Sequence, residues 1–299
     1  MDWAFFVEVF VGGLLAGVMY ALVALGFVLI YKASGVFNFA QGGMVFFAAL
    51  TFVSLTERGW NFWLALAATL AVMIALGVAI ERVVLRPLVN QPPITLFMAT
   101  IGLSFVLEGL SQLLWGSQPH GLELGIPDVP IEWLARALNI NVSQFDLFAA
   151  AVAGVLVAVL AVLFQKTRIG RALRAVADDH QAALAVGIPL QNIWAIVWGV
   201  AGFVALIAGL MWGVRNGVQY SLTFVVLKAL PVLILGGFES IPGAIVGGLI
   251  IGASEKLAEV YLGPMVGGGI ESWFAYVIAL LFLLVRPQGL FGEKIIDRV

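Results

Sequence analysis

Long runs of apolar residues, separated by short polar stretches, dominate this chain. Five runs are nearly free of charge, and only Glu108 interrupts one of them; they are residues 9–31, 62–80, 94–114, 147–164 and 193–214. A helix needs about 20 apolar residues to cross roughly 30 Å of hydrocarbon. The pattern therefore predicts at least five membrane-spanning helices.

Two further apolar stretches, residues 37–55 and 222–253, are poor candidates for simple spans. The first opens with FNFAQGG, and the second is interrupted by Lys228, Pro231, Gly236, Gly237, Pro242 and Gly243. Backbone groups freed at membrane depth are tolerated only against protein or a watery cavity. We therefore predict broken or re-entrant helices in both stretches, although each glycine can equally be a contact between packed helices.

These patterns together predict an all-α, polytopic transmembrane bundle of about eight or nine membrane segments. Charged residues make up 11% of the 299 positions, well below the roughly 25% of soluble domains. The 34 glycines favour close helix packing. Short connections leave no room for a soluble domain, so residues 1–299 are expected to form one transmembrane domain.

The distribution of basic residues predicts the orientation, because Lys and Arg collect in cytoplasmic loops. An external N-terminus and a cytoplasmic C-terminus leave only Arg58, Arg136 and Arg215 outside. The basic residues then inside are Lys32, Arg82, Arg86, Lys166, Arg168, Arg171, Arg174, Arg286, Lys294 and Arg298. The long loop at residues 116–143 is expected outside.

Sequence motifs for catalysis are absent. The chain has no GxxxxGK[ST] phosphate loop, no HExxH and no GxSxG, and its histidines, His120 and His180, fall on opposite sides of the membrane in this topology. ATP hydrolysis, metalloprotease activity and serine hydrolysis lack their usual residues. With zero cysteines, disulfides and thiolate metal sites are excluded. We expect no enzyme activity and no metal site.

A polar, basic connector at residues 165–192 joins two of the apolar runs, and it is called the basic connector below. Asp178 and Asp179 are good N-cap residues, residues 180–186 are compatible with a helix, and Gly187 followed by Pro189 favours its end. A short helix is therefore predicted across the cytoplasmic face. Its alanines, Ala182, Ala183 and Ala185, would form a smooth ridge for a partner's groove. The alternative is an ordinary solvated loop.

The stretch GRALRAVADDHQAALAVGIP at residues 170–189 resembles the cytoplasmic coupling loop of permease subunits of high-affinity branched-chain amino-acid ABC transporters. Five more blocks agree in order: the stretch at 13–43, ERVVLRPL at 81–88, ATIGLSFVLEG at 99–109, the stretch at 227–255, and RPQGLFG at 286–292. Gln41 stands where that family usually has histidine, so a role that needs an imidazole is not carried over.

This resemblance implies a permease in a bacterial inner membrane that pairs with a second homologous permease subunit, two ATP-binding subunits and an external solute-binding protein. Membrane lipid would surround it, and nucleic acid is not expected as a partner. ATP and Mg would bind the partner subunits, with no cofactor on this chain. The ATPase-coupling residues would be Gly170, Arg171, Arg174, Asp178, Asp179, Ala182, Ala183 and Gly187. Leucine, isoleucine and valine are the expected solutes; urea, short amides and other amino acids remain alternatives.

Ionisable residues inside a membrane suggest function because burying them is costly. Glu108 and Lys228 are the interior candidates, either as a structural pair or along a path for a zwitterion, and Glu255, Lys256 and Glu259 gather near a helix end. Uncharged hydrogen bonds along a path could come from Asn38, Gln41, Thr100 and Ser104, with Gly42, Gly236 and Gly237 at its broken segments.

Two other classes of protein compete with this interpretation. A secondary transporter or channel would work alone, with Glu108 or Lys228 as a proton or ion site. A capped cytoplasmic helix argues against that class, because a lone carrier does not require one. A purely structural membrane scaffold is disfavoured by the paired broken segments.

Overall fold

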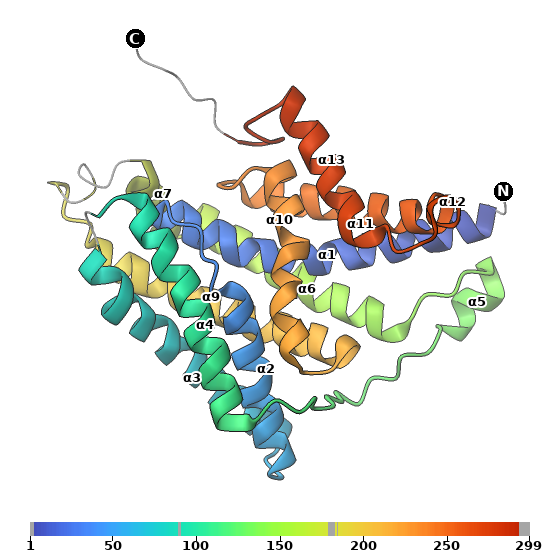
Figure 1. Ribbon diagram of the computed structural model, residues 1–299, viewed down its shortest axis with the longest axis horizontal. Coiled ribbons are helices and arrows are strands. Elements are labelled where there is room, and N and C mark those ends of the chain that lie inside the picture. Colours follow the sequence, from blue (N-terminus) through green and yellow to red (C-terminus); the bar gives the residue numbers. More distant parts are fainter. Residues whose placement is uncertain (1–2, 89–90, 179–182, 184, 293–299) are drawn as a thin grey trace. The chain divides into compact units, whose positions relative to one another are not determined.

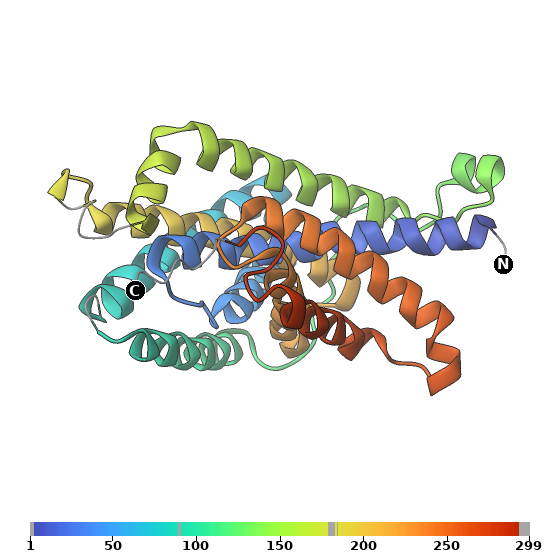
Figure 2. The same cartoon turned by 90° about the horizontal axis from the view of Figure 1, so that it is seen from above.

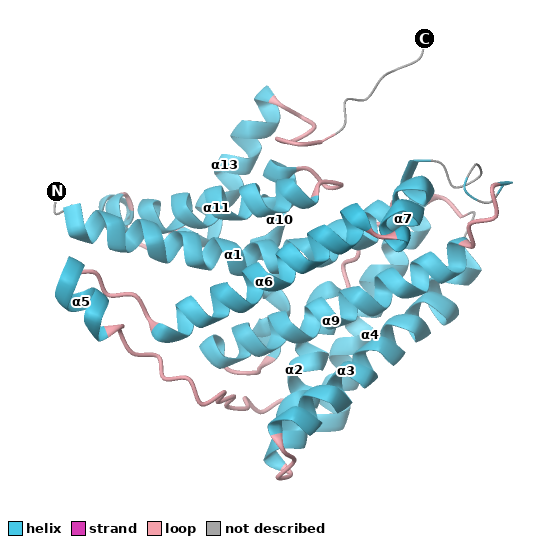
Figure 3. Cartoon of the chain, turned by 180° about the vertical axis from the view of Figure 1, so that it is seen from behind, coloured by secondary structure: helices cyan, strands magenta, loops and turns pink. Residues whose placement is uncertain are grey.

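The computed structural model describes residues 3–88, 91–178, 183 and 185–292 (Figure 1). These residues are almost entirely helical, and no strand is drawn among them in Figure 3. The helices and short turns are α1 (Trp3–Ser34), α2 (Gln41–Glu57), α3 (Phe62–Ala79), η1 (Ile80–Leu85), η2 (Arg86–Leu88), α4 (Pro93–Trp115), α5 (Glu132–Leu138), α6 (Gln144–Lys166), α7 (Arg168–Asp178), α9 (Leu190–Asn216), η3 (Tyr220–Phe224), α10 (Val225–Gly236), α11 (Ile241–Tyr261), α12 (Gly263–Val266) and α13 (Glu271–Val285).

Within the described residues, six helices are long and apolar enough to cross a membrane. Five of them, α1, α3 with its extension to Leu88, α4, α6 and α9, coincide with the five predicted spans. The sixth is α11, and the segments Tyr220–Gly236 and Glu271–Val285 are shorter apolar helices. The prediction of an all-helical polytopic membrane protein is confirmed.

The chain divides into two compact units. Unit 1 comprises Met1–Leu25, Gly125–Val159 and Leu227–Val299, and unit 2 comprises Gly26–Leu124 and Leu160–Val226. Each unit therefore combines segments that are far apart in the sequence.

Helix α2 is the centre of unit 2. It packs against α3, α4, α9 and η3, and all of its residues from Gln41 to Val53 are buried. Close contacts with glycine build the packing around it. A Cβ on Gly209 of α9 would lie 2.6 Å from the Val45 carbonyl oxygen of α2, and one on Gly202 would lie 2.7 Å from that of Met73 in α3. Because backbone meets backbone, these helices are held at short distances.

In unit 1, α1 and α11 cross one another (Figure 2). Four glycines form the seam between them. A Cβ on Gly17 would lie 2.4 Å from the carbonyl oxygen of Gly248, and one on Gly252 would lie 2.3 Å from that of Gly13. The glycine seam, formed by Gly13, Gly17, Gly248 and Gly252, brings the two helix backbones into direct contact. Some of the 34 glycines thus act as the packing contacts that the sequence allowed.

The predicted break in residues 222–253 is present. Helix α10 ends at Gly236 and α11 begins at Ile241, where the Ser240 hydroxyl caps the helix by accepting a hydrogen bond from the Gly243 amide. The stretch 37–55 behaves differently, because α2 is a continuous helix from Gln41 and only the residues before it are non-helical. Pro231 lies inside α10 without ending it.

The six-residue π-helix η1 follows the C-terminal end of α3 and contains one partner of a partly buried ion pair. Arg86 Nε and Nη2 donate to the two carboxylate oxygens of Glu81 at 3.0 and 2.9 Å. A π-helix has an i to i+5 repeat, so its wider turn brings residues 81 and 86 onto one face. The Glu81 side chain is only 1% exposed, and Arg86, which is 35% exposed, is its charged partner.

Replacing Arg86 with alanine is expected to reduce the free energy of unfolding by about 3 kcal/mol, because it leaves a buried carboxylate without a partner. A lower midpoint of thermal unfolding in detergent, followed by tryptophan fluorescence, would report this loss. Arg82→Ala removes an exposed arginine from the same turn and should leave the midpoint unchanged. Equal midpoints for the two variants would contradict the argument.

Candidate functional site

The basic connector begins with a tight corner between α6 and α7. Thr167 caps α7, because its Oγ1 accepts a hydrogen bond of 3.2 Å from the Gly170 amide. A Cβ on residue 170 would lie 1.9 Å from the Phe164 carbonyl oxygen, so the corner requires glycine there. Gly170, which was expected to be a coupling residue, thus has a structural role in the corner itself.

Arg171 and Arg174 turn back onto the end of α6. The two guanidinium nitrogens of Arg174 donate to the carbonyl oxygens of Phe164 and Gln165 at 2.7 and 3.3 Å, and Arg171 Nη1 lies 3.5 Å from the carbonyl oxygen of Lys166. The last carbonyls of a helix lack intrahelical partners, and basic side chains commonly satisfy them. These arginines were predicted to face a partner, and the structure adds that they brace the corner.

Helix α7 was not predicted from the sequence. Its apolar side chains Leu173 and Val176 are buried, whereas Lys166 and Arg168 at the corner are exposed. Asp178 is the last residue of α7, and residues 179–182 lie outside the described part of the chain, so its predicted N-cap role stays a prediction. The connector therefore presents a basic, exposed surface on an amphipathic helix.

Part of the predicted short helix lies outside the described residues, and with it Asp179 and Ala182. Its C-terminal end is described: residues 183 and 185 are helical, Gly187 has φ +83°, and the Ile188 amide donates to the Ala183 carbonyl at 2.9 Å. This bond and the left-handed glycine make a Schellman motif. Ala183 is 2% exposed, so it faces protein and does not belong to an exposed ridge.

Helix α9 starts immediately after this motif and runs from the basic connector into the core of unit 2. Trp194 Nε1 donates to the Ala33 carbonyl oxygen at 2.9 Å, which fixes the beginning of α9 against the end of α1. Further along, Gly202 and Gly209 contact the backbones of α3 and α2. The connector and the buried helix α2 are thus joined through one continuous helix.

The predicted polar residues at the start of α2 do come together. Asn38 Oδ1 accepts from the Ala40 amide at 3.1 Å, and its Nδ2 donates to Gln41 Oε1 at 3.2 Å. Thr100 Oγ1, from α4, accepts from the Phe39 amide at 3.3 Å. Asn38, Gln41 and Thr100 are all 0% exposed, so they form a closed polar junction in the non-helical bend between α1 and α2.

The other predicted pathway residues of unit 2 lie close to this junction or on α4. A Cβ on Gly42 would lie 2.3 Å from the Thr223 carbonyl oxygen, so this glycine is a contact between α2 and η3. Ser104 donates to Glu108 Oε1 at 3.1 Å, one turn along α4. Gly42 is therefore explained by packing, and Glu108 has a local hydrogen-bond donor.

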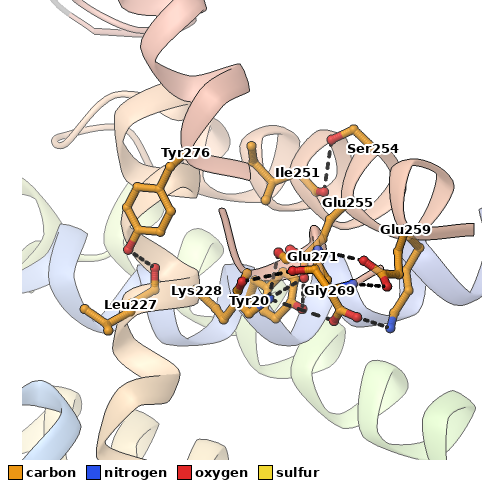
Figure 4. Close-up of polar contacts among 12 residues, drawn as sticks. Tyr20, Leu227, Lys228, Ile251, Ser254, Glu255, Glu259, Gly269, Glu271 and Tyr276 are labelled. Atoms are coloured by element: carbon orange, nitrogen blue, oxygen red, sulfur yellow. Dashed lines mark hydrogen bonds and ion pairs between the residues drawn. The ribbon is translucent and has the colours of Figure 1, made fainter. Parts of the chain in front are cut away.

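Lys228 of unit 1 has partners that the sequence did not predict (Figure 4). Instead of the proposed pairing with Glu108, its Nζ lies 2.5 Å from Glu255 Oε1 of α11, 3.1 Å from the carbonyl oxygen of Glu271 and 3.8 Å from Glu271 Oε1. Lys256 Nζ donates to Glu271 Oε2 at 3.1 Å. The gathering of charges near the end of α11 was visible in the sequence, but Glu271 was missed because it lies beyond a glycine-rich turn.

Gly236 and Gly237 are crowded by backbone. A Cβ on Gly236 would lie 2.2 Å from the Gly243 carbonyl oxygen, and one on Gly237 would lie 2.9 Å from the Gly292 nitrogen. Amides of Leu290 and Phe291 donate to the carbonyls of Leu235 and Gly236 at 2.8 and 3.1 Å. The contacts of these two glycines thus support the packing alternative over a place along a pathway.

These features define an integral membrane protein with a braced basic connector and polar groups inside its helical units. A family model described as the permease component of branched-chain amino acid transport systems matches residues 9–286. The chain belongs to this family, and the resemblance proposed from its sequence motifs is confirmed.

Individual relatives agree with the family over their full length. The branched-chain amino acid permease LivH of Escherichia coli K12 is 29% identical over 100% of this chain and 99% of its own. LivH of Salmonella typhimurium is 28% identical with the same coverage. BraD of Pseudomonas aeruginosa is 29% identical over 98% of both chains.

Proposed function

We propose that this chain is the membrane subunit of an ATP-driven, binding-protein-dependent importer that passes leucine, isoleucine and valine across a bacterial inner membrane. Family membership supports this solute class, and so does the likeness to LivH and BraD, which are permeases of branched-chain amino acid transport systems. A second homologous permease subunit, two ATP-binding subunits and an external solute-binding protein complete the importer. ATP and Mg bind the partner subunits.

The topology proposed for this permease has nine membrane segments, an external N-terminus and a cytoplasmic C-terminus. Helices α1, α2, α3, α4, α6, α9, α10, α11 and α13 alternate in direction along the chain in this arrangement. The basic connector and Arg286 then lie inside, where Lys and Arg are favoured. The α5 loop lies outside.

The observation that best supports coupling to an ATPase is the continuous link from the basic connector through α9 to α2. Gly187 ends the short helix in a Schellman motif, α9 follows at once, and its glycines meet the backbones of α3 and α2. A packed helix with backbone contacts moves as a rigid body, because tightly packed interiors do not deform continuously. Force applied by an ATPase at the connector is thereby carried to the buried centre of unit 2.

The polar junction of Asn38, Gln41 and Thr100 lies where α2 begins, and this position suits a gate. It is fully buried, and it occupies the non-helical bend that a shift of α2 would open or close. Movement of α9 together with α2 changes the environment of this bend. We therefore assign the junction to the inner gate and the connector to ATPase coupling.

Reconstitution into vesicles tests this function. Vesicles that contain this chain, its partner permease, the ATPases and the binding protein should accumulate labelled leucine only with ATP and only when every component is present. A pull-down of the tagged chain should retain the ATPase subunits. Accumulation by this chain alone, independent of ATP, would reject the proposal in favour of a secondary transporter.

A further inference from the structure

We propose that Lys228, Glu255, Lys256 and Glu271 form a binding site for the ammonium and carboxylate groups of a zwitterionic amino acid. This inference rests on the proposed function, and it adds a solute site on the permease itself. The four residues are called the charge cluster below, and they come from α10, α11 and the start of α13 within unit 1. Figure 4 labels three of them, Lys228, Glu255 and Glu271.

The cluster is held together by Lys228 and Glu271. Lys228 Nζ uses its donors on Glu255 Oε1, on the Glu271 carbonyl oxygen and toward Glu271 Oε1, at 2.5, 3.1 and 3.8 Å. Glu271 Oε2 accepts from Lys256 Nζ at 3.1 Å. Glu255 and Lys256 are therefore connected through a single lysine and a single carboxylate, and all four charged groups lie at one place.

Two groups of the cluster retain unused bonding capacity, and they have opposite charges. Glu255 Oε2 is buried and has no hydrogen-bond partner among the described residues, although the Glu255 side chain is only 1% exposed. Lys256 has three N–H donors, and one of them is directed to Glu271. An ammonium group can donate to Glu255 Oε2, and a carboxylate can accept from Lys256. One zwitterion supplies both groups on a single carbon.

One side of the cluster is accessible while its deepest carboxylate is not. The side chains of Lys228, Lys256 and Glu271 are 27%, 31% and 33% exposed, compared with 1% for Glu255. A solute that arrives from the exposed side meets the partly exposed Lys228, Lys256 and Glu271 before the buried Glu255. In the proposed topology the end of α11 and the start of α13 are external, which is where a binding protein delivers its solute.

Neighbouring residues hold the cluster in place and leave Glu255 Oε2 without a hydrogen-bond donor in the part of the chain that the structure describes. Glu259 accepts from the amides of Gly269 and Glu271 at 2.9 and 2.8 Å, and this fixes the glycine-rich turn that carries Glu271. Tyr20 of α1 donates to Glu255 Oε1 at 3.2 Å, which leaves Oε2 as the open position. A site that is held by its surroundings loses less conformational freedom when a ligand binds.

A purely structural role explains this arrangement poorly. Well-packed apolar residues commonly stabilise a buried interface as well as or better than an ion pair does, and ionisable groups inside membranes are costly. Packing alone therefore does not require four charges here. Recognition of a zwitterion gives each charge a role, because Glu255 and Lys256 each bind one solute group, and Lys228 and Glu271 hold these two in place.

Equilibrium binding of labelled L-leucine to the purified transporter, assembled with its ATPases but without the binding protein, tests the site. We expect saturable binding, and at least tenfold weaker competition by leucinamide, which lacks the carboxylate, and by 4-methylpentanoate, which lacks the ammonium. Lys256→Met and Glu255→Gln should each weaken leucine binding at least tenfold. Arg136→Gln removes an exposed charge of the same unit and should bind as the parent does.

A variant with Lys228→Met and Glu255→Leu separates recognition from folding, because it replaces the buried pair by apolar residues. Retention of the ATPases in a pull-down together with lost leucine binding supports the site. No saturable binding by the parent protein, or unchanged binding by Lys256→Met and Glu255→Gln, overturns it. ATP-dependent leucine uptake by the parent importer would then still support the proposed function, so the two failures are distinguishable.

Discussion

Replacing Gly252 with valine should almost eliminate folded protein from the membrane. A Cβ at this position would lie 2.3 Å from the Gly13 carbonyl oxygen and 2.5 Å from the nitrogen and Cα of Gly17. All three are backbone atoms of α1, so no side chain can rotate away. The helices must separate along the whole glycine seam, and we expect a loss of about 3 kcal/mol or more, at the upper end of overpacking costs.

Gly12→Val provides the matched control for this prediction. Gly12 lies in α1 next to the seam, yet a Cβ there meets nothing within 4 Å. Both substitutions put the same residue inside a membrane helix, so they differ only in what the new side chain contacts. Size-exclusion profiles of a fluorescent fusion should show a single symmetric peak for Gly12→Val and aggregate for Gly252→Val. Similar profiles would mean that the seam does not set the packing of α1 and α11.

Replacing Gly187 with valine should uncouple ATP hydrolysis from transport. Gly187 has φ +83°, and a Cβ added there would meet no atom within 4 Å, so the obstacle is backbone strain and not space. The left-handed conformation costs an L-residue about 1–2 kcal/mol. We expect the end of the short helix to unwind, leucine uptake to fall at least tenfold, and ATPase activity of the assembled importer to persist.

Two comparisons isolate the backbone effect at Gly187. Asparagine tolerates the left-handed conformation better than most residues do, so Gly187→Asn should recover most of the uptake. Gly121→Val alters a loop glycine that also has free space around it but no positive φ, and its uptake should be normal. Full uptake by Gly187→Val would show that the Schellman motif has no part in coupling.

The sequence predicts the membrane helices well because the signal for them is local. Each of the five apolar runs corresponds to a helix of spanning length, and the break before Ile241 follows from the cluster of glycine and proline. The end of the short helix at Gly187 was also predictable, because its left-handed conformation depends mainly on residue type. A family resemblance spread over most of the chain then pointed to the correct family.

Contacts between distant segments could not be predicted in this way. Arg174 has the same charge whether it faces a partner or caps α6, and only the turn at Gly170 decides which carbonyls it reaches. Glu255 finds its lysine in another helix. Helix α7 was missed because its basic residues and the acidic pair at its end are typical of a loop, although Leu173 and Val176 lie on one helical face.

Glycines were the most ambiguous residues. Gly42, Gly236 and Gly237 were expected along a pathway, whereas the structure places each against the backbone of another segment. An absent side chain serves both purposes equally, so composition does not distinguish between them. Only the identity of the opposing atom does.

The bonds from Leu290 and Phe291 to the last carbonyls of α10 have a consequence for biosynthesis. Residues 225–261 are synthesised before Leu290 and Phe291. The two carbonyls at the turn of this hairpin therefore lack these donors until those later residues are made. The hairpin is therefore completed only after α13 and the segment that follows it have been made. A purification tag inserted before Gln288 should weaken these bonds, because it lengthens the connection from α13 to Leu290, whereas one placed after Gly292 leaves that connection unchanged.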